Sequence, residues 1–395
     1  MSGYNKEKRE QFYEYCKGII EGKNGRNLFE KYKKILETIT PRYVMEVFHK
    51  IVEDGYPMDD IKKGVNKILH TVYLPLKNYK SLPYSENSPI GLFVKDNDEM
   101  EKRLNEIKPL IKRLNKGENQ SLEPLKKKFL SLSKFTLHYT VKENTVFPLL
   151  EKKSDYFKCT QIMWSFDDDI RENLKKINSL LENDFSLKEF NLLSGRLFFD
   201  MFAISFRENK IVFPYLLEIA EENEINSILE EIREMGLPFV NTEKIGKTDT
   251  EAKSGNTDLK KVNLKTGTLT PEQIILIFNH LPVDITYVDE NNEVKFFSTP
   301  KDKIFPRTKS VLGRKVQNCH PPESIDTVNR IVESFRKGKK DKADFWIKFK
   351  DKFVLIQYFA VRNEKGEYKG VLEVTQDITD IKKLEGEKRL LDWEE

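Results

Sequence analysis

Apolar side chains recur at three- and four-residue steps through the first two thirds of the chain, a spacing that predicts helices. One such helix begins at Thr40-Pro41, because Thr can cap a helix and Pro tolerates its first position. It ends where Asp54-Gly55 interrupts the pattern. Short helices of this kind predict an all-α domain over residues 1–85.

Longer periodic stretches follow, and they predict an antiparallel four-helix bundle over residues 86–240. From residue 241 apolar residues thin out, while Lys, Thr, Gly, Asn and Asp dominate as far as residue 270. Such a composition cannot bury enough apolar surface to fold on its own. Residues 241–270 are therefore predicted to form a flexible linker.

After Pro271 the hydrophobic period changes from that of a helix to that of a strand. Five β-rich runs are expected to form strands, namely Ile285–Val288, Val294–Phe297, Asp344–Phe349, Phe353–Phe359 and Gly370–Thr375. A segment of helical character separates the second run from the third. This order predicts an α+β domain with a five-stranded antiparallel sheet over residues 271–395.

Composition narrows the class of protein further. The 395 residues are too many for one core, and 68 Lys and Arg nearly balance 64 Asp and Glu. That balance favours neither nucleic acid nor an anionic membrane as a partner. Three widely separated cysteines exclude a disulfide framework, and no apolar stretch is long enough to span a bilayer. We expect a cytoplasmic protein.

Three motifs in the last segment resemble the PAS family of sensory domains. Leu281-Pro-Val-Asp284 leads into the first strand, Cys319-His-Pro-Pro322 precedes a helix, and Asp377-Ile-Thr379 ends the sheet. From this acid-Ile-Thr ending PAS domains pass a signal into a following helix, which would be residues 382–393. The resemblance implies a domain that binds a small ligand or a partner protein.

Two related stretches in the middle segment resemble the hemerythrin-like HHE bundles. They are HYTVKENTVFP, from His138 to Pro148, and ISFRENKIVFP, from Ile204 to Pro214. Iron-binding members of that family use histidines and carboxylates from all four helices. Taken as a whole, the chain resembles the domain-of-unknown-function family 438, which joins a helical domain, an HHE bundle and a PAS domain.

The predicted bundle lacks most of the ligands that this resemblance implies. A di-iron centre needs roughly five imidazoles, whereas the bundle contains a single histidine, His138. Helix geometry places Lys142 on the same face as His138 and turns Glu143 away from it. We hypothesise that Lys142 pairs with Glu208 across the bundle and substitutes for the lost metal charge. The alternative is a mononuclear iron or manganese ion on His138, Asp167 and Glu208.

The inward faces of the predicted sheet and its connecting helices should line a PAS pocket. The candidate cofactor- or ligand-binding residues are Phe296, Phe305, Val316, His320, Trp346, Ile356 and Tyr358. A haem held by His320 is an alternative, although the expectation is a pocket histidine without haem. His70 matches a histidine of the N-terminal family domain, for which a capping or core-edge role is the default.

No glycine-rich phosphate loop, nucleophile elbow or Ser/His constellation is present, so the chain is not expected to be an enzyme. We predict a sensory or regulatory protein whose PAS domain binds a small ligand or a partner protein, with a homodimer as one route for the signal. No cofactor is the leading expectation. The alternatives are a hemerythrin-like iron- or dioxygen-binding protein and a haem-based PAS sensor of gas or redox state.

Overall fold

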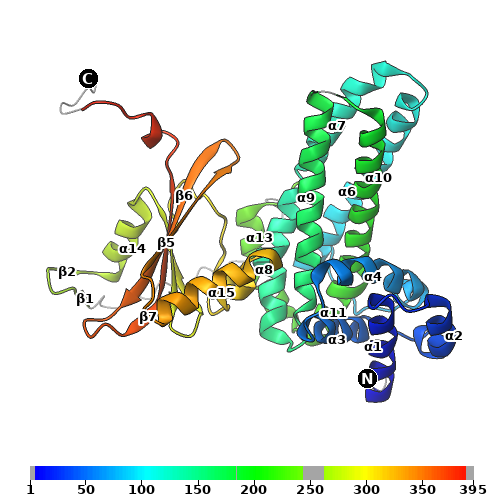
Figure 1. Ribbon diagram of the computed structural model, residues 1–395, viewed down its shortest axis with the longest axis horizontal. Coiled ribbons are helices and arrows are strands. Elements are labelled where there is room, and N and C mark those ends of the chain that lie inside the picture. Colours follow the sequence, from blue (N-terminus) through cyan, green and yellow to red (C-terminus); the bar gives the residue numbers. More distant parts are fainter. Residues whose placement is uncertain (1–4, 184, 243–261, 388–395) are drawn as a thin grey trace. The chain divides into compact units, whose positions relative to one another are not determined.

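The computed structural model describes residues 5–183, 185–242 and 262–387. The chain divides into two compact units, Met1–Lys247 and Thr248–Glu395. Each unit has its own hydrophobic core. The first is helical and the second is built on an antiparallel sheet (Figure 1), as the hydrophobic periods predict.

Five helices open the first unit: α1 (Lys6–Ile20), α2 (Gly25–Leu36), α3 (Pro41–Glu53), α4 (Met58–Thr71) and α5 (Tyr73–Lys77). Asn5 and Asn24 cap α1 and α2, each accepting hydrogen bonds from two backbone N–H groups of the first turn. Helix α3 begins with Pro41 after Thr40, as predicted, and ends at the Asp54 cap before Gly55. Thr40 makes no side-chain capping hydrogen bond, and α4 and α5 also begin without one, so side chains cap only α1 and α2 among these five helices.

The predicted bundle forms from longer helices that run side by side in Figure 1. Its elements are α6 (Pro89–Leu114), η1 (Asn119–Ser121), α7 (Leu122–Ser133), α8 (Thr136–Lys153), α9 (Cys159–Glu182), α10 (Leu187–Arg207), η2 (Glu208–Val212), α11 (Phe213–Ile219), α12 (Glu222–Asn226) and α13 (Leu229–Met235). Between α10 and α11, η2 is a π-helical segment. Such segments are rare and occur frequently at functional sites.

The N-terminal helices and the bundle share one core rather than two. Helix α3 packs against α9, η2 and α11, and α4 packs against α9. Buried side chains from both predicted domains belong to the same apolar cluster, among them Phe48 on α3 and Ile162 on α9. The boundary expected near residue 85 therefore does not separate two cores, because α3 is buried over most of its surface.

The second unit contains all five predicted strands: β3 (Asp284–Asp289), β4 (Val294–Phe297), β5 (Lys342–Phe349), β6 (Lys352–Arg362) and β7 (Tyr368–Asp377). They form an antiparallel sheet in the order β4-β3-β7-β6-β5. The remaining elements are β1 (Val262–Asn263), β2 (Thr268–Leu269), α14 (Pro271–His280), η3 (Lys309–Val311), η4 (Val316–Cys319), α15 (Pro322–Arg336) and η5 (Ile381–Lys383).

Two helices lie on opposite faces of this sheet (Figure 1). Helix α15 covers the face that carries Val288 and Val371, which are paired across β3 and β7. On the other face, Phe278 of α14 contacts Phe296 of β4, with ring centroids 5.2 Å apart. Sequence reasoning missed α14, although Thr270 and Gln273 form a capping box at its start.

Two predictions at the ends of the second unit, the flexible linker and the C-terminal helix, need correction where the structure describes them. Part of the predicted linker, residues 262–269, forms the β1–β2 hairpin, and residues 243–261 lie outside the described residues. A helix is predicted over residues 382–393, but residues 384–387 are not helical. Gly386 has a positive φ of 65° there, which does not continue a right-handed helix. Residues 382–383 belong to the 3-10 helix η5, and residues 388–393 lie outside the described residues.

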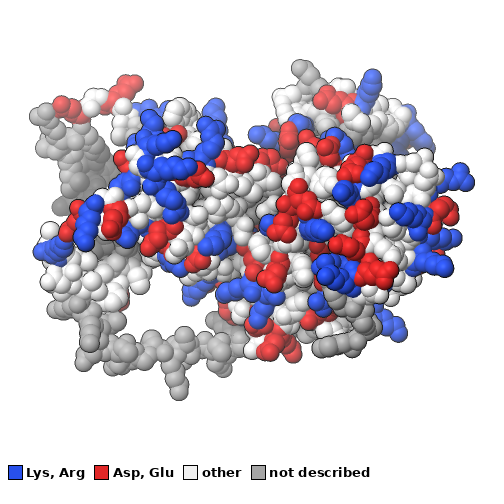
Figure 2. All heavy atoms as spheres, turned by 60° about the horizontal axis from the view of Figure 1, so that its bottom comes forward, with Lys and Arg blue, Asp and Glu red and all other residues white. Residues whose placement is uncertain are grey.

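Lys and Arg are interspersed with Asp and Glu over the visible face of the helical unit (Figure 2). This mixture agrees with the near balance of charge in the sequence. None of the helices in the described residues has both the length and the apolar character needed to cross a lipid bilayer.

Candidate functional site

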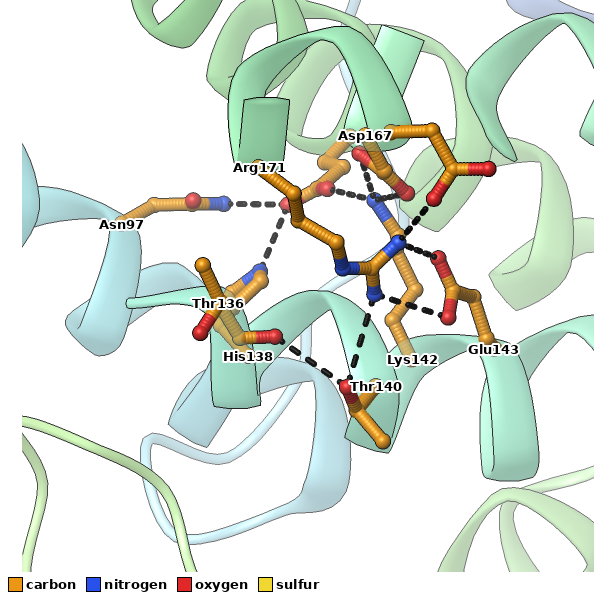
Figure 3. A network of polar contacts seen from close by, with 10 residues as sticks. Asn97, Thr136, His138, Thr140, Lys142, Glu143, Asp167 and Arg171 are labelled. Carbon is orange, nitrogen blue, oxygen red and sulfur yellow. Dashed lines mark hydrogen bonds and ion pairs between the residues drawn. The ribbon is translucent and has the colours of Figure 1, made fainter. Parts of the chain in front are cut away.

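A cluster of charged side chains is buried within the helical unit, and Figure 3 shows it from close by. Its side chains come from four elements, α6, α8, α9 and η2. Each element carries at least one buried polar residue among apolar neighbours. Its innermost members, each with 0% of the side chain exposed, are Asp96, His138, Lys142, Asp167 and Glu208. Charges sealed from water in this way must be paired.

Lys142 lies between two carboxylates from different elements. Its Nζ is 2.5 Å from Oε1 of Glu208 on η2 and 2.8 Å from Oδ2 of Asp167 on α9. The hypothesised pairing of Lys142 with Glu208 is thereby confirmed, with Asp167 as an additional partner. One ammonium group thus bridges three elements.

His138 connects the same carboxylate to α6. Its Nε2 is 2.9 Å from Oε2 of Glu208, and its Nδ1 is 2.8 Å from Oδ2 of Asp96. The other oxygen of Asp96 accepts a hydrogen bond from the backbone N–H of Phe239. Asn97 donates to Glu208 over 2.8 Å, so Glu208 has three partners.

Sequence reasoning missed Asp96 and Asn97. Both lie on α6 among buried apolar side chains such as Phe93 and Met100. A polar pair inside an apolar stripe at helical spacing was the signal that could have identified them.

The surroundings of the cluster shift the pKa values of its members. Burial by itself would lower the pKa of His138, but Glu208 and Asp96 outweigh it and raise the pKa to about 9. Burial would raise the pKa of Glu208, yet Lys142 and His138 hold it at about 2. His138 is therefore an imidazolium and Glu208 a carboxylate at neutral pH. Burial raises the pKa of Asp167, because Lys142 offsets only part of the desolvation.

A second ion pair lies beside this cluster. Arg171 on α9 donates through both terminal nitrogens to the carboxylate of Glu143, with both N–O distances at 2.9 Å. Arg171 also donates to Asp168, one turn earlier on α9. The prediction that Glu143 turns away from His138 is confirmed, since Glu143 faces Arg171.

The structure brings His138, Asp167 and Glu208 together, but not as a set of metal ligands. The Lys142 ammonium lies between the two carboxylates, and the His138 nitrogen that faces Glu208 is already bonded to it. An ammonium and an imidazolium repel a cation at this position. Within the described parts of the chain, no three His, Cys, Asp or Glu side chains are arranged to hold a metal ion.

Strand register decides which predicted pocket residues of the second unit lie on the α15 face. Ile356 and Tyr358 lie on that face, four and two residues before Ala360, which is paired with Val371. Phe296 and Trp346 lie on the opposite face, which corrects the prediction that they line the same pocket. The sequence could not show which alternate positions face inward.

The remaining predicted residues lie in the segment between β4 and α15. Phe305 contacts Phe349 at the end of β5, with ring centroids 5.2 Å apart. Val316 packs against the apolar core of the unit. His320 is partly buried, and its Nδ1 lies 2.8 Å from the carbonyl oxygen of Val316.

A row of polar side chains crosses the α15 face of the sheet. Thr286 on β3, Glu373 on β7 and Tyr358 on β6 are neighbours in register. Arg307 reaches this row and donates to Glu373 over 2.6 Å. The hydroxyl of Thr286 is buried and has no hydrogen-bond partner among the described residues.

The pKa values of two groups in this polar row are shifted by their surroundings. Burial raises the pKa of Tyr358, and the nearby Glu373 carboxylate raises it further. Burial opposes the charge on Arg307, but Glu373 outweighs it and raises the pKa of the guanidinium. Sequence reasoning missed Glu373, although a carboxylate at an alternate position between Val371 and Thr375 marks a polar residue on a buried face.

Comparison with known proteins identifies the fold of the second unit. The family model described as a PAS domain matches residues 274–379, about a quarter of the chain. The chain therefore contains a PAS domain. No curated protein matches the chain.

Three similar solved structures each cover a third of the chain or less. A C-terminal domain from Streptococcus mutans is 36% identical, with 33% of this chain and 100% of that chain covered and a TM-score of 0.31. A PAS domain from Colwellia psychrerythraea is 16% identical over 28% and 97% of the two chains, with a TM-score of 0.23. A sensory box sensor histidine kinase from Vibrio cholerae is 14% identical over 27% and 93%, with a TM-score of 0.22.

Removing Lys142 should destabilise the helical unit strongly. Lys142→Met leaves two buried carboxylates without their shared cation, and Glu208→Gln takes from Lys142 and from His138 one of the two carboxylates that each contacts. Breaking a buried pair typically costs about 3–5 kcal/mol, which for a unit of this size corresponds to about 10 °C in Tm. Circular dichroism during heating measures this loss.

Lys176→Met is the matched control, because Lys176 pairs with Glu172 on the exposed side of α9. Its effect should stay within about 0.5 kcal/mol. Unchanged Tm values for both Lys142→Met and Glu208→Gln would contradict the proposed role of the cluster.

The raised pKa of His138 makes stability dependent on pH. Its contribution is present in full below the unfolded value of 6.5 and is lost as pH rises through about 9. The size of the shift corresponds to a contribution on the order of 3 kcal/mol. Urea unfolding at pH 7 and pH 10 should show a larger loss of stability in the wild type than in His138→Gln. Parallel pH profiles would exclude a charged His138.

Proposed function

We propose that this chain is a non-catalytic sensory or regulatory protein whose PAS domain binds a small ligand with polar or charged groups. The observation that supports the ligand class is the row formed by Arg307, Glu373, Tyr358 and Thr286 on the α15 face of the sheet. An apolar ligand would desolvate the Arg307–Glu373 pair further and leave the Thr286 hydroxyl without a partner, which is costly. The Thr286 hydroxyl has no hydrogen-bond partner among the described residues and can form one with a polar ligand.

The helical unit serves in this proposal as a hemerythrin-like bundle that has exchanged its metal for side-chain charge. Two observations support this origin. Lys142 occupies the position between carboxylates where a bound cation would lie, and Glu208 begins a π-helical segment. The bundle then acts as a rigid scaffold, and the signal passes from the PAS domain to a partner protein or to a second copy of the chain in the cytoplasm.

A haem-based PAS sensor is the second candidate, and one observation favours it. Nδ1 of His320 must donate to the carbonyl oxygen of Val316, which leaves Nε2 as the basic nitrogen. A histidine oriented in this way by its other nitrogen suits metal ligation. Haem would supply gas binding or redox chemistry at that position.

Native mass spectrometry of the full chain tests the proposed ligand class. We expect a small polar molecule to remain bound to the purified wild type and to be lost from Arg307→Met and Glu373→Gln. Lys342→Met is the control, since Lys342 pairs with Asp344 on the exposed edge strand β5. A bound molecule that both Arg307→Met and Glu373→Gln retain would contradict the proposal. A Soret band that disappears in His320→Ala would favour the haem sensor instead.

A further inference from the structure

A cavity lies in the helical unit, and none of the charge cluster's residues line it. It has a volume of about 260 Å³ and lies between α1, α3 and the connection from α8 to α9. Its polar and aromatic lining includes Arg9, Tyr13, Glu46, His49, Lys50 and Tyr156. Ligand pockets of roughly 300–1,000 Å³ take drug-sized molecules, so this one suits a smaller metabolite.

The walls of the cavity are fixed by contacts between its own side chains. The hydroxyl of Tyr13 on α1 donates to Asp54 at the end of α3. Lys50 lies over the Tyr13 ring, 4.0 Å from its centroid. On the opposite side the His49 ring meets Tyr156 edge-on, with centroids 5.6 Å apart. The cavity is therefore formed before any ligand binds.

Most polar groups in this lining already have partners. Nδ1 of His49 accepts from the backbone N–H of Lys158, and Nε2 lies 3.6 Å from the Glu53 carboxylate. Lys50 lies 3.5 Å from Glu10. These groups shape the cavity without calling for a ligand.

Two buried polar atoms of this lining, one acceptor and one donor, have no hydrogen-bond partner among the described residues. Glu46 is 2% exposed, and although its Oε1 accepts from Arg42, its Oε2 has no hydrogen-bond partner among the described residues. The same holds for the buried Nε–H of Arg9. Buried polar atoms without partners are rare, and each requires an explanation such as a bound molecule.

We propose that this cavity binds a small zwitterion of the free amino acid class. Its ammonium group donates to Oε2 of Glu46, and its carboxylate accepts from the Nε–H of Arg9. The rings of Tyr13, His49 and Tyr156 surround the rest of the molecule. A simple amine satisfies only Glu46 and a simple acid only Arg9, so the pair of unfilled atoms selects a molecule that carries both groups. The helical unit then receives a signal of its own, independently of the PAS domain.

Isothermal titration of the full chain with each of the twenty common amino acids tests this proposal. We expect saturable binding of at least one of them at one site per chain. The matching amine without its carboxylate, and the matching acid without its amine, should each bind at least tenfold more weakly. No binding by any amino acid, or equal binding of the one-group analogues, would overturn the proposal.

Variants distinguish this cavity from any other binding site. Glu46→Gln and Arg9→Met should each weaken binding at least tenfold, whereas Glu30→Gln, an exposed carboxylate on α2, should leave it unchanged. Arg9 is only partly buried, so Arg9→Met keeps the test valid if Glu46→Gln fails to fold. Circular dichroism confirms the fold of each variant. Full binding by folded Arg9→Met would place the amino acid elsewhere and overturn the assignment.

Discussion

The ammonium group of Lys142, held between Glu208 and Asp167, is the interaction on which the helical unit depends. All three side chains are sealed from water, so each needs the others to offset the cost of desolvation. Because they come from α8, η2 and α9, no one of these elements can shift without exposing a buried charge. His138 extends the same constraint to α6 through Asp96. A fixed set of charges thus performs the positioning that a bound metal performs in a metalloprotein.

The two units use charged side chains in physically different ways. In the helical unit the central carboxylates and cations are fully buried and fully paired, an arrangement that holds structure and leaves little to a ligand. In the PAS domain the Arg307 and Glu373 side chains remain 20% and 13% exposed and lie beside an unfilled hydroxyl. A pair that water still reaches can exchange partners when a molecule enters. This difference is the physical basis for placing the proposed polar-ligand site on the sheet and the proposed scaffold role in the charge cluster.

The sequence was sufficient for the elements and for the residues that share one helical face. The five strands follow from their period, and the spacing of His138 and Lys142 places both on one face of α8. The pairing of Lys142 with Glu208 was inferred from the likeness between the two related stretches. Other contacts between distant segments were not predictable. Asp96 was missed because periodicity does not say which polar group meets His138, and Phe296 and Trp346 were misplaced because alternate strand positions have no absolute orientation without the register. Hydrophobic periodicity also does not show that the N-terminal helices and the bundle share one core, because it describes only local sequence.

Elemental analysis of the full chain, purified without chelator and then incubated with iron(II) or manganese(II), tests the central claim most directly. If Lys142 stands in place of a metal, the protein should carry no stoichiometric transition metal, and the added ions should leave its Tm unchanged. One iron or manganese ion per chain, lost in His138→Ala and accompanied by a higher Tm, would contradict the account.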